Sequence, residues 1–426
     1  MLLRAQHGES QLSGQTANGR PGIRAVFARP AYRRLWAART ASAAGDAFAT
    51  VALSLLVLDL TGSGLGVTGV VAAEIVPVLL LGPVAGIVVD RWSPVPVMVY
   101  ADLARMVCAL SLPLVAGSAA GVYALAFAMS AASVFFNPAA GSTVPSIVGS
   151  DELVAANSGI WSAAVFVQIV LAPAAGAVVL VAGYAPAFWV NAASFAVSAL
   201  VLRKLRVDRA GSADASKDRW WPRAREGFAL LGRHRVLRAL AVGQLFAALS
   251  AGATSALLVV YIKDRLGLDS RGYGLALALI GAGAALGPLA LSRFVSNPRR
   301  PAFVFGPYLL RAAVDGVLAF TLSPVLALGA LAGYGLGTST GAVTFTSLLQ
   351  AETPAEARGR IFTAFDVIWQ LGRLISLGIG GILADRAGLP IVYASGAVLL
   401  TAAAIIGWTS LRAADKDHGS ARIHDI

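Results

Sequence analysis

Two acidic residues in apolar surroundings are the side chains of this sequence best suited to proton chemistry. Asp46 and Glu74 each lie within a long apolar stretch, and neither has a basic residue one helical turn away. A carboxyl group in such a position binds a proton when it is buried and releases it when it is hydrated. We therefore expect Asp46 and Glu74 to couple a proton gradient to the movement of a solute, or to contact the solute itself.

Two pairs of opposite charges lie in other apolar stretches. Asp102 precedes Arg105 by three residues. Arg311 precedes Asp315 by four residues. Each spacing places both members of a pair on one face of a helix. An ionised side chain in the middle of a membrane helix costs about 2.5–3.5 kcal/mol on insertion scales. We therefore expect two structural braces near the inner surface, with a direct role in a transport cycle as the alternative.

A third set of polar side chains could line a solute cavity. Asp366 and Arg373 lie seven residues apart, two helical turns along one face, with Trp369 and Gln370 between them. An indole ring can stack on an apolar solute, and an amide can orient its polar groups. The alternative is a polar contact between helices. Gln168 and Gln244 are weaker candidates for the same cavity.

The elements that must position these residues are membrane-spanning helices. The chain of 426 residues is 57% hydrophobic and 13% charged, which is too apolar for a soluble domain. A spanning helix needs about 20 residues, so the length accommodates about twelve spans. The apolar runs place them near 34–59, 64–89, 95–117, 120–146, 155–182, 184–203, 237–262, 272–294, 302–322, 324–348, 360–384 and 389–411.

One long polar interruption divides the chain into two halves. We expect a tail at 1–33, a six-helix half at 34–203, a linker at 204–236, a second six-helix half at 237–411 and a tail at 412–426. Within the linker, apolar residues at helical spacing beside cations predict a helix over 223–234 on the membrane surface. The halves share the positions of their short turns, which predicts a cavity between them near mid-membrane.

The distribution of basic residues predicts the orientation in the membrane. The two tails and the linker are rich in Arg and Lys, and the opposite loops offer few cations: Lys263, Arg265, Arg271 and Arg386. By the positive-inside rule, both termini and the linker are cytoplasmic, and the protein lies in the cytoplasmic (inner) cell membrane. The same rule accounts for the net charge of +12, so nucleic acid is not an expected partner.

Several function classes are excluded or disfavoured. The single Cys rules out a disulfide framework, and all four His residues fall in polar segments, so we expect no metal and no cofactor. A primary pump is disfavoured because no phosphate-binding loop motif occurs. A membrane-embedded transferase is less favoured because the acidic residues are scattered, and a receptor would leave Asp46 and Glu74 unexplained. We expect a monomeric transporter, not an enzyme, with a small molecule, protons and lipid as partners.

One motif resembles a known family. Gly86, Asp90 and Arg91 follow the pattern of the loop 2–3 signature of the major facilitator superfamily, with Trp92 and Ser93 next in place of the usual glycine and basic residues. The resemblance implies an all-α membrane protein of twelve transmembrane helices in two pseudo-symmetric halves. It also implies a packing role for Gly86. The carboxylate of Asp90 could cap the amino end of a neighbouring helix.

Further stretches are similar to the branch of that superfamily with macrolide-efflux and enterobactin-exporter types. They are Phe27-Ala-Arg-Pro, Arg34-Leu-Trp36, Gly45-Asp46, Ala101-Asp102-Leu-Ala-Arg105, Phe136-Asn137-Pro138 and 145–157. The expected fifth span partly fits an antiporter motif at Gly159, Gln168, Ala172-Pro173 and Gly176. In this branch the Gly-Asp pair is usual, so Asp46 has an architectural role as its alternative.

The leading hypothesis is export of a hydrophobic or amphipathic small molecule, a drug or natural product, in exchange for protons by alternating access. The alternatives are nutrient uptake and facilitated diffusion without ion coupling. Residues 381–388 repeat the shape of the loop 2–3 signature at the opposite membrane face. The sequence assigns them no function.

Overall fold

The structure is a computed structural model that describes residues 23–149, 152–207, 228–232, 234–294, 301–353 and 358–423. Within these ranges the chain forms helices and turns, with no strand. The first half contains α1 (Ile23–Ala28), α2 (Pro30–Thr61), α3 (Gly64–Arg91), α4 (Pro94–Ser111), η1 (Leu112–Val115), α5 (Ala119–Ile147), α6 (Leu153–Ala182) and α7 (Tyr184–Leu202). The second half contains α9 (Arg235–Ala256), α10 (Leu258–Val260), η2 (Tyr261–Arg265), α11 (Ser270–Phe294), α12 (Pro301–Phe320), α13 (Pro324–Glu352), α14 (Arg358–Ala387) and α15 (Leu389–Ile423).

Local sequence signals begin and end these helices. Gly62 ends α2 in the left-handed conformation, with φ of 57°, which a residue without a Cβ adopts at no steric cost. The next residue, Ser63, caps α3 by accepting a hydrogen bond from the Gly66 N–H at 2.9 Å. Proline opens α2, α4 and α13, where its missing N–H would have no intrahelical partner. The turns between spans are therefore short and defined.

The twelve-helix expectation is confirmed, since each expected span coincides with a long helix. Eleven helices in the described ranges are long and apolar enough to cross a membrane. The expected span at 324–348 corresponds to α13, which is 29 residues long but contains several Gly, Ser and Thr residues. The expected span at 237–262 is divided among α9, α10 and the π-helix η2.

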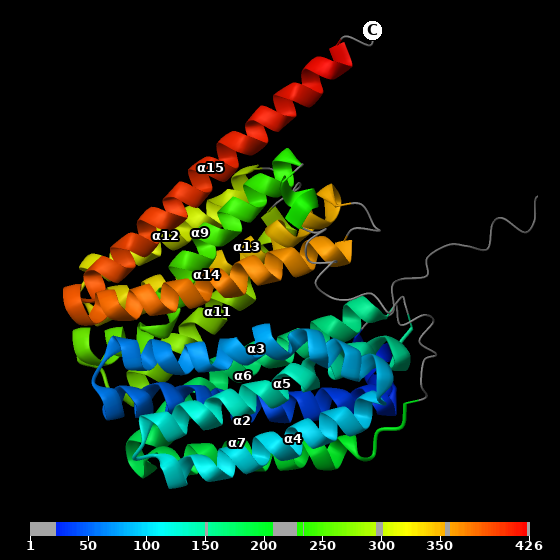
Figure 1. The fold of residues 1–426 in the computed structure, drawn as a ribbon, viewed down its shortest axis with the longest axis vertical. Helices are drawn as coiled ribbons and strands as arrows, with labels where there is room; N and C mark the ends of the chain where they lie inside the picture. The colour runs from blue at the N-terminus through cyan, green and yellow to red at the C-terminus, as the bar shows by residue number, and fades with distance from the viewer. Residues whose placement is uncertain are drawn as a thin grey trace, which may run out of the picture.

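The segments outside the expected spans differ in part from the expectation. α1 lies in the expected tail, and its Val26 is buried in the core of the first half. α15 continues to Ile423, beyond the expected end of the last span, and projects from the bundle (Figure 1). Of the surface helix expected over 223–234, residues 228–232 are helical, and most of the remainder lies outside the described residues.

The apolar cores reveal how the halves meet. We call the end of the bundle with the turns at 62–63, 183, 266–269 and 388 the distal end, and the opposite end the linker end. The largest core cluster joins residues of both halves, among them Leu55 and Leu56 of α2 with Val259 and Tyr261 of the second half. The other two large clusters each belong to one half, with Tyr32 and Phe136 in one and Phe305 and Leu400 in the other.

Two helix pairs make the most extensive contacts between the halves among the described residues. α3 packs beside α14, and α6 beside α11; Figure 1 shows α3 and α14 adjacent where the two bundles meet. The α6–α11 contact is a backbone contact, since a Cβ on Gly176 would lie 2.2 Å from the carbonyl oxygen of Ser270. A Cβ on Gly274 would lie 2.4 Å from the carbonyl oxygen of Ala172. Small residues permit this approach, as at other membrane-helix interfaces.

An ion pair at the linker end gives a pH-dependent expectation. The Glu152 carboxylate accepts a hydrogen bond from the Gly149 N–H at 3.0 Å and pairs with Arg29 at 2.8 Å. These contacts, the Gly149 N–H first, hold the pKa of Glu152 below its usual value. A depressed pKa adds stability that is present above the usual glutamic acid range and is lost as pH falls through the lowered value.

Replacing Glu152 by Gln is therefore expected to lower the thermal unfolding midpoint at neutral pH and to leave it unchanged at acidic pH, where the wild-type carboxyl is protonated. Thermal unfolding of both proteins in detergent, across an acid-to-neutral pH series, measures the difference. Arg29→Gln is the matched variant and should show a smaller loss with the same pH dependence. A difference between Glu152→Gln and wild type that is constant with pH would contradict this account.

Candidate functional site

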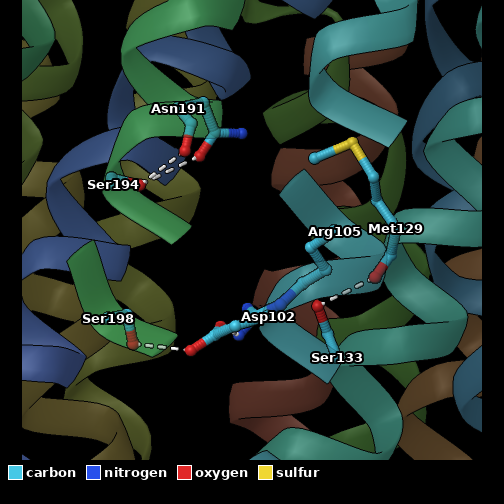
Figure 2. A network of polar contacts seen from close by, with 7 residues as sticks. All are labelled: Asp102, Arg105, Met129, Ser133, Asn191, Ser194 and Ser198. Carbon is cyan, nitrogen blue, oxygen red and sulfur yellow. Dashed lines mark hydrogen bonds and ion pairs between the residues drawn. The ribbon is translucent and has the colours of Figure 1, made fainter. Parts of the chain in front are cut away.

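The first charge pair lies in the core of the first half. Asp102 and Arg105 of α4 are 0% and 4% exposed and form an ion pair, so their expected pairing is confirmed. The second carboxylate oxygen of Asp102 accepts a hydrogen bond from the Ser198 hydroxyl of α7 at 2.6 Å. Figure 2 shows Ser198 pointing at Asp102 from the opposite helix. Both oxygens of Asp102 are thereby satisfied.

Two aromatic rings enclose the cation of this pair. The guanidinium carbon of Arg105 lies 4.4 Å from the ring centroids of both Phe136 on α5 and Phe195 on α7. The ring faces attract the cation while they exclude water. Asp102, Arg105 and Ser198 therefore connect α4 to α7, and the rings extend the contact to α5. The expected brace is a buried polar cluster of three helices.

The two unpaired carboxyl groups of the sequence lie within electrostatic range of each other. Asp46 of α2 and Glu74 of α3 are both exposed, although both lie in the middle of spanning helices. Neither forms an ion pair among the described residues. The adjacent Gly45 is buried, and a Cβ there would lie 2.0 Å from the Ser194 hydroxyl of α7. Gly45 therefore serves the packing of α2, and the neighbouring Asp46 is left exposed.

Charges from both halves surround this pair of carboxyl groups. Asp46 is within electrostatic range of Arg105 and Asp102. Glu74 is within range of Asp46 and of Arg373 on α14, in the opposite half. Tyr273 of α11 is also within electrostatic range of Glu74. We call the series Arg373, Glu74, Asp46 and Arg105 the charge relay; it runs from the second half to the first.

The other predicted cavity residues of α14 have separate surroundings. Asp366 is exposed, whereas Trp369 is half-buried and packs against the linker-end core of the second half. The Trp369 contacts favour the helix-packing alternative over stacking on a solute. Gln370 is half-buried, and its Oε1 has no hydrogen-bond partner among the described residues. Of this set, Arg373 alone is among the neighbours that influence Glu74 electrostatically.

The two glutamines differ in position. Gln168 lies in the contact between the halves, because a Cβ on Gly281 of α11 would lie 3.0 Å from its Cγ. Gln168 therefore takes part in the α6–α11 interface, at the antiporter-like positions of α6. Gln244 is half-buried on α9.

The expected pairing of Arg311 with Asp315 is wrong. Arg311 and Asp315 of α12 are both buried, yet within the described part of the chain they form no ion pair with each other. The guanidinium instead donates to the Tyr334 hydroxyl of α13 at 3.1 Å, and Asp315 accepts from Ser250 of α9 at 3.2 Å. The physical reason is competition: a tyrosine ring and hydroxyl offer Arg311 both a hydrogen bond and a cation–π contact, at 4.6 Å.

The loop 2–3 signature is only partly visible. The side chain of Asp90 and the surroundings of Gly86 lie outside the described residues. Arg91 is exposed at the end of α3 and makes a contact. The similar segment at 381–388 does make a capping contact, since Asp385 accepts hydrogen bonds from the N–H groups of Gly64 and Leu65 at 2.6 and 3.2 Å.

The distal end contains a second polar link between the halves that sequence reasoning missed. Lys263 of η2 pairs with Asp59 of α2 at 2.6 Å, and Tyr184 of α7 donates to the same carboxylate. At the same end of the bundle, Asp385 caps the amino end of α3, where the helix dipole favours an anion. The repeated signature is the signal that could have identified Asp385. No comparable signal marks Asp59.

Similar architectures occur among solved structures. The nucleoside transporter NupG superposes with a TM-score of 0.75 and 13% identity, covering 89% of this chain and 99% of that one. A bacterial homologue of the iron transporter ferroportin in the inward-facing state gives a TM-score of 0.68 at 16% identity, covering 89% and 98%. At these identities the likeness establishes the fold.

Sequence relatives are closer. The multidrug efflux pump Tap of Mycolicibacterium fortuitum is 30% identical over 371 residues, which cover 83% of this chain and 89% of that protein. Tap of Mycobacterium tuberculosis (strain ATCC 25618 / H37Rv) is 28% identical over 380 residues, covering 84% and 88%.

Two six-helix halves that share a core at one end, with acidic side chains exposed in the middle of two spanning helices, define a multi-pass secondary transporter. The family model described as Major Facilitator Superfamily matches residues 35–377 and 240–423. The chain belongs to that superfamily, and it is a transporter of small molecules, not an enzyme.

Proposed function

We propose that this protein exports a hydrophobic or amphipathic small molecule, a drug or natural product, in exchange for protons by alternating access. The observation that carries the proposal is the charge relay, in which Glu74 and Asp46 are exposed and, among the described residues, without an ion-pair partner, between Arg373 of one half and Arg105 of the other. Ionisable groups are costly in a membrane and are kept where they serve transport.

Rocking of the halves would change the proton affinity of Glu74. Arg373 belongs to the opposite half, so its distance from Glu74 changes whenever the halves move. An approaching cation favours the ionised carboxylate, and a departing one favours the protonated form. Proton binding and release are thereby linked to the conformation. Gln370, whose buried Oε1 has no hydrogen-bond partner in the part of the chain that the structure describes, is the candidate to orient a solute beside Arg373.

The export direction rests on the relatives and on the branch resemblance. Tap is described as a multidrug efflux pump and covers most of this chain. We assign the linker end to the cytoplasm, with both termini there, from the Arg and Lys content of the tails and linker. The shared core then closes the protein toward the outside, which corresponds to an inward-facing state in the cytoplasmic membrane. We expect the protein to act as a monomer.

Transport of the lipophilic cationic dye ethidium into inverted membrane vesicles tests the proposal. A proton gradient, acidic inside the vesicle, is expected to drive ethidium uptake by the wild-type protein. Glu74→Gln and Asp46→Asn should lose the gradient-driven part, because an amide binds no proton at this pH. Asp264→Asn, an exposed acidic residue of η2, is the matched control and should transport as wild type.

The same assay distinguishes the alternatives. Ethidium movement that is independent of the proton gradient would indicate a facilitator and would exclude antiport. Accumulation that requires the opposite gradient would point to uptake. Wild-type coupling in both carboxyl variants would remove Glu74 and Asp46 from the mechanism.

A further inference from the structure

The unpaired acid of α12 is a buried group that the proposed function does not use. Asp315 is 0% exposed. Its Oδ2 accepts a hydrogen bond from Ser250 at 3.2 Å, and its Oδ1 has no hydrogen-bond partner among the described residues. The corresponding Asp102 in the first half has an arginine on one oxygen and a serine on the other. Asp315 therefore also accepts a hydrogen bond from a serine, although from a helix in a different position, and it forms no ion pair with an arginine among the described residues.

The missing arginine is one helical turn away. Arg311 is 4% exposed, donates to Tyr334 through Nη2, and has an Nε without a partner in the same described ranges. A cation and an acid four residues apart on one helix face are within reach of each other. Two orphaned atoms, Arg311 Nε and Asp315 Oδ1, therefore belong to residues that could satisfy one another.

Glycines on both sides define the space around this pair. A Cβ on Gly337 of α13 would lie 2.9 Å from Cγ of Arg311. A Cβ on Gly396 of α15 would lie 2.9 Å from Oδ2 of Asp315. Neighbouring backbones thus approach both side chains closely, and they leave the carboxyl little room for water. Asp315 therefore lies in a tightly packed site between helices.

Among the described groups that face Asp315, none forms an ion pair with it. Its own helix supplies Arg311, held on Tyr334 of α13. α9 supplies the hydroxyl of Ser250, and α15 supplies Tyr393, whose own hydroxyl donates to the Thr254 carbonyl. A buried carboxylate with one hydrogen bond and no paired cation is strongly disfavoured relative to its neutral acid.

We propose that Asp315 is a proton-binding site of the transport cycle, protonated in this conformation and emptied when Arg311 leaves Tyr334 to pair with it. This inference rests on the proposed proton antiport. In the step, water that reaches the carboxyl as the neighbouring helices move accepts the proton of the carboxylic acid, which becomes a carboxylate, while the guanidinium stays charged and changes partner. The paired Asp102–Arg105 cluster of the first half has the geometry that the second half would reach after release.

Infrared difference spectroscopy of the full-length protein in lipid, between acidic and alkaline pH, tests the assignment without a transported solute. The wild-type spectrum should contain a carboxylic-acid C=O band that titrates and that is lost in Asp315→Asn. Asp102→Asn should keep this band, and Asp315→Glu should keep an acid band and show that the site tolerates substitution. An Asp315→Asn spectrum identical to wild type would overturn the proposal.

A second variant tests the switch itself. Tyr334→Leu removes both the hydroxyl and the ring that hold Arg311, so Arg311 is expected to pair with Asp315, and the acid band should be weaker at neutral pH than in wild type. An unchanged or stronger band would overturn the exchange of partners.

Ethidium transport in inverted vesicles distinguishes a failure of the Asp315 assignment from a failure of proton antiport. In a wild-type protein that is coupled to the gradient, Asp315→Asn should lose the gradient-driven uptake. Coupled transport with an unchanged Asp315→Asn infrared spectrum would refute the assignment of Asp315 alone. Wild-type transport that does not depend on the proton gradient would refute antiport. It would also refute the role of Asp315 in coupling.

Discussion

Replacing Arg105 by Met is expected to lower the free energy of unfolding by about 3–5 kcal/mol, the usual cost of removing one partner of a buried pair. The variant leaves the Asp102 carboxylate at 0% exposure with the Ser198 hydroxyl as its remaining partner. It also removes the cation between Phe136 and Phe195. The thermal unfolding midpoint of the purified protein, with the yield of monodisperse material as a second readout, measures the loss.

The matched control removes both charges. A double variant, Asp102→Leu with Arg105→Met, takes away the unpaired anion, so most of the lost stability should return. Such a recovery would show that Arg105 stabilises the fold by neutralising Asp102, and that the protein does not need the positive charge itself in order to fold. A loss below about 1 kcal/mol in Arg105→Met, which is typical of an exposed pair, would contradict the buried brace.

Replacing Gly176 by Leu is expected to open the distal end. A Cβ at this position would lie 2.2 Å from the backbone oxygen of Ser270, so no side-chain rotation can relieve the clash. Overpacking of this kind costs about 1–3 kcal/mol, which corresponds to about a 5- to 150-fold change in a conformational equilibrium. The closed distal end should lose population by that factor.

Spin labels on two further loops at the distal end, one in each half, measure this shift. Gly117→Cys lies between η1 and α5, and Leu322→Cys between α12 and α13, in a Cys108→Ser background. Electron–electron distance distributions should move to longer values in Gly176→Leu. Gly141→Leu, whose surroundings are open, should leave them unchanged. A folded Gly176→Leu protein with the wild-type distribution would show that this contact does not close the distal end.

The arrangement of spans could be predicted from the sequence because lipid requires it. A helix that crosses the membrane needs an apolar run of fixed minimum length, and turn residues such as Gly62 and Ser63 interrupt these runs at the helix ends. Asp102 and Arg105 could be paired for a similar reason, since helical spacing places them on one face. Both signals can be read from residues that are close together in the sequence.

The part of the site that could not be predicted depends on partners distant in the sequence. Arg311 and Asp315 have a spacing as favourable as that of the first pair, but Tyr334 and Ser250 from other helices separate them. The same applies to Asp385, which caps a helix 320 residues away. The sequence leaves a solute-facing Trp369 and a contact between helices as alternatives, and the core cluster against which this side chain packs includes residues of α9, α12, α13 and α15.

The backbone contact between α6 and α11 has a consequence for the cost of movement. Ala172, Pro173, Gly176 and Gly274, which form much of this contact, have no side-chain rotamers to lose when surfaces meet. Separating these two helices and bringing them together again therefore costs little side-chain conformational entropy. A joint of this composition favours repeated, reversible opening, with the barrier set by desolvation and dispersion contacts instead of side-chain ordering.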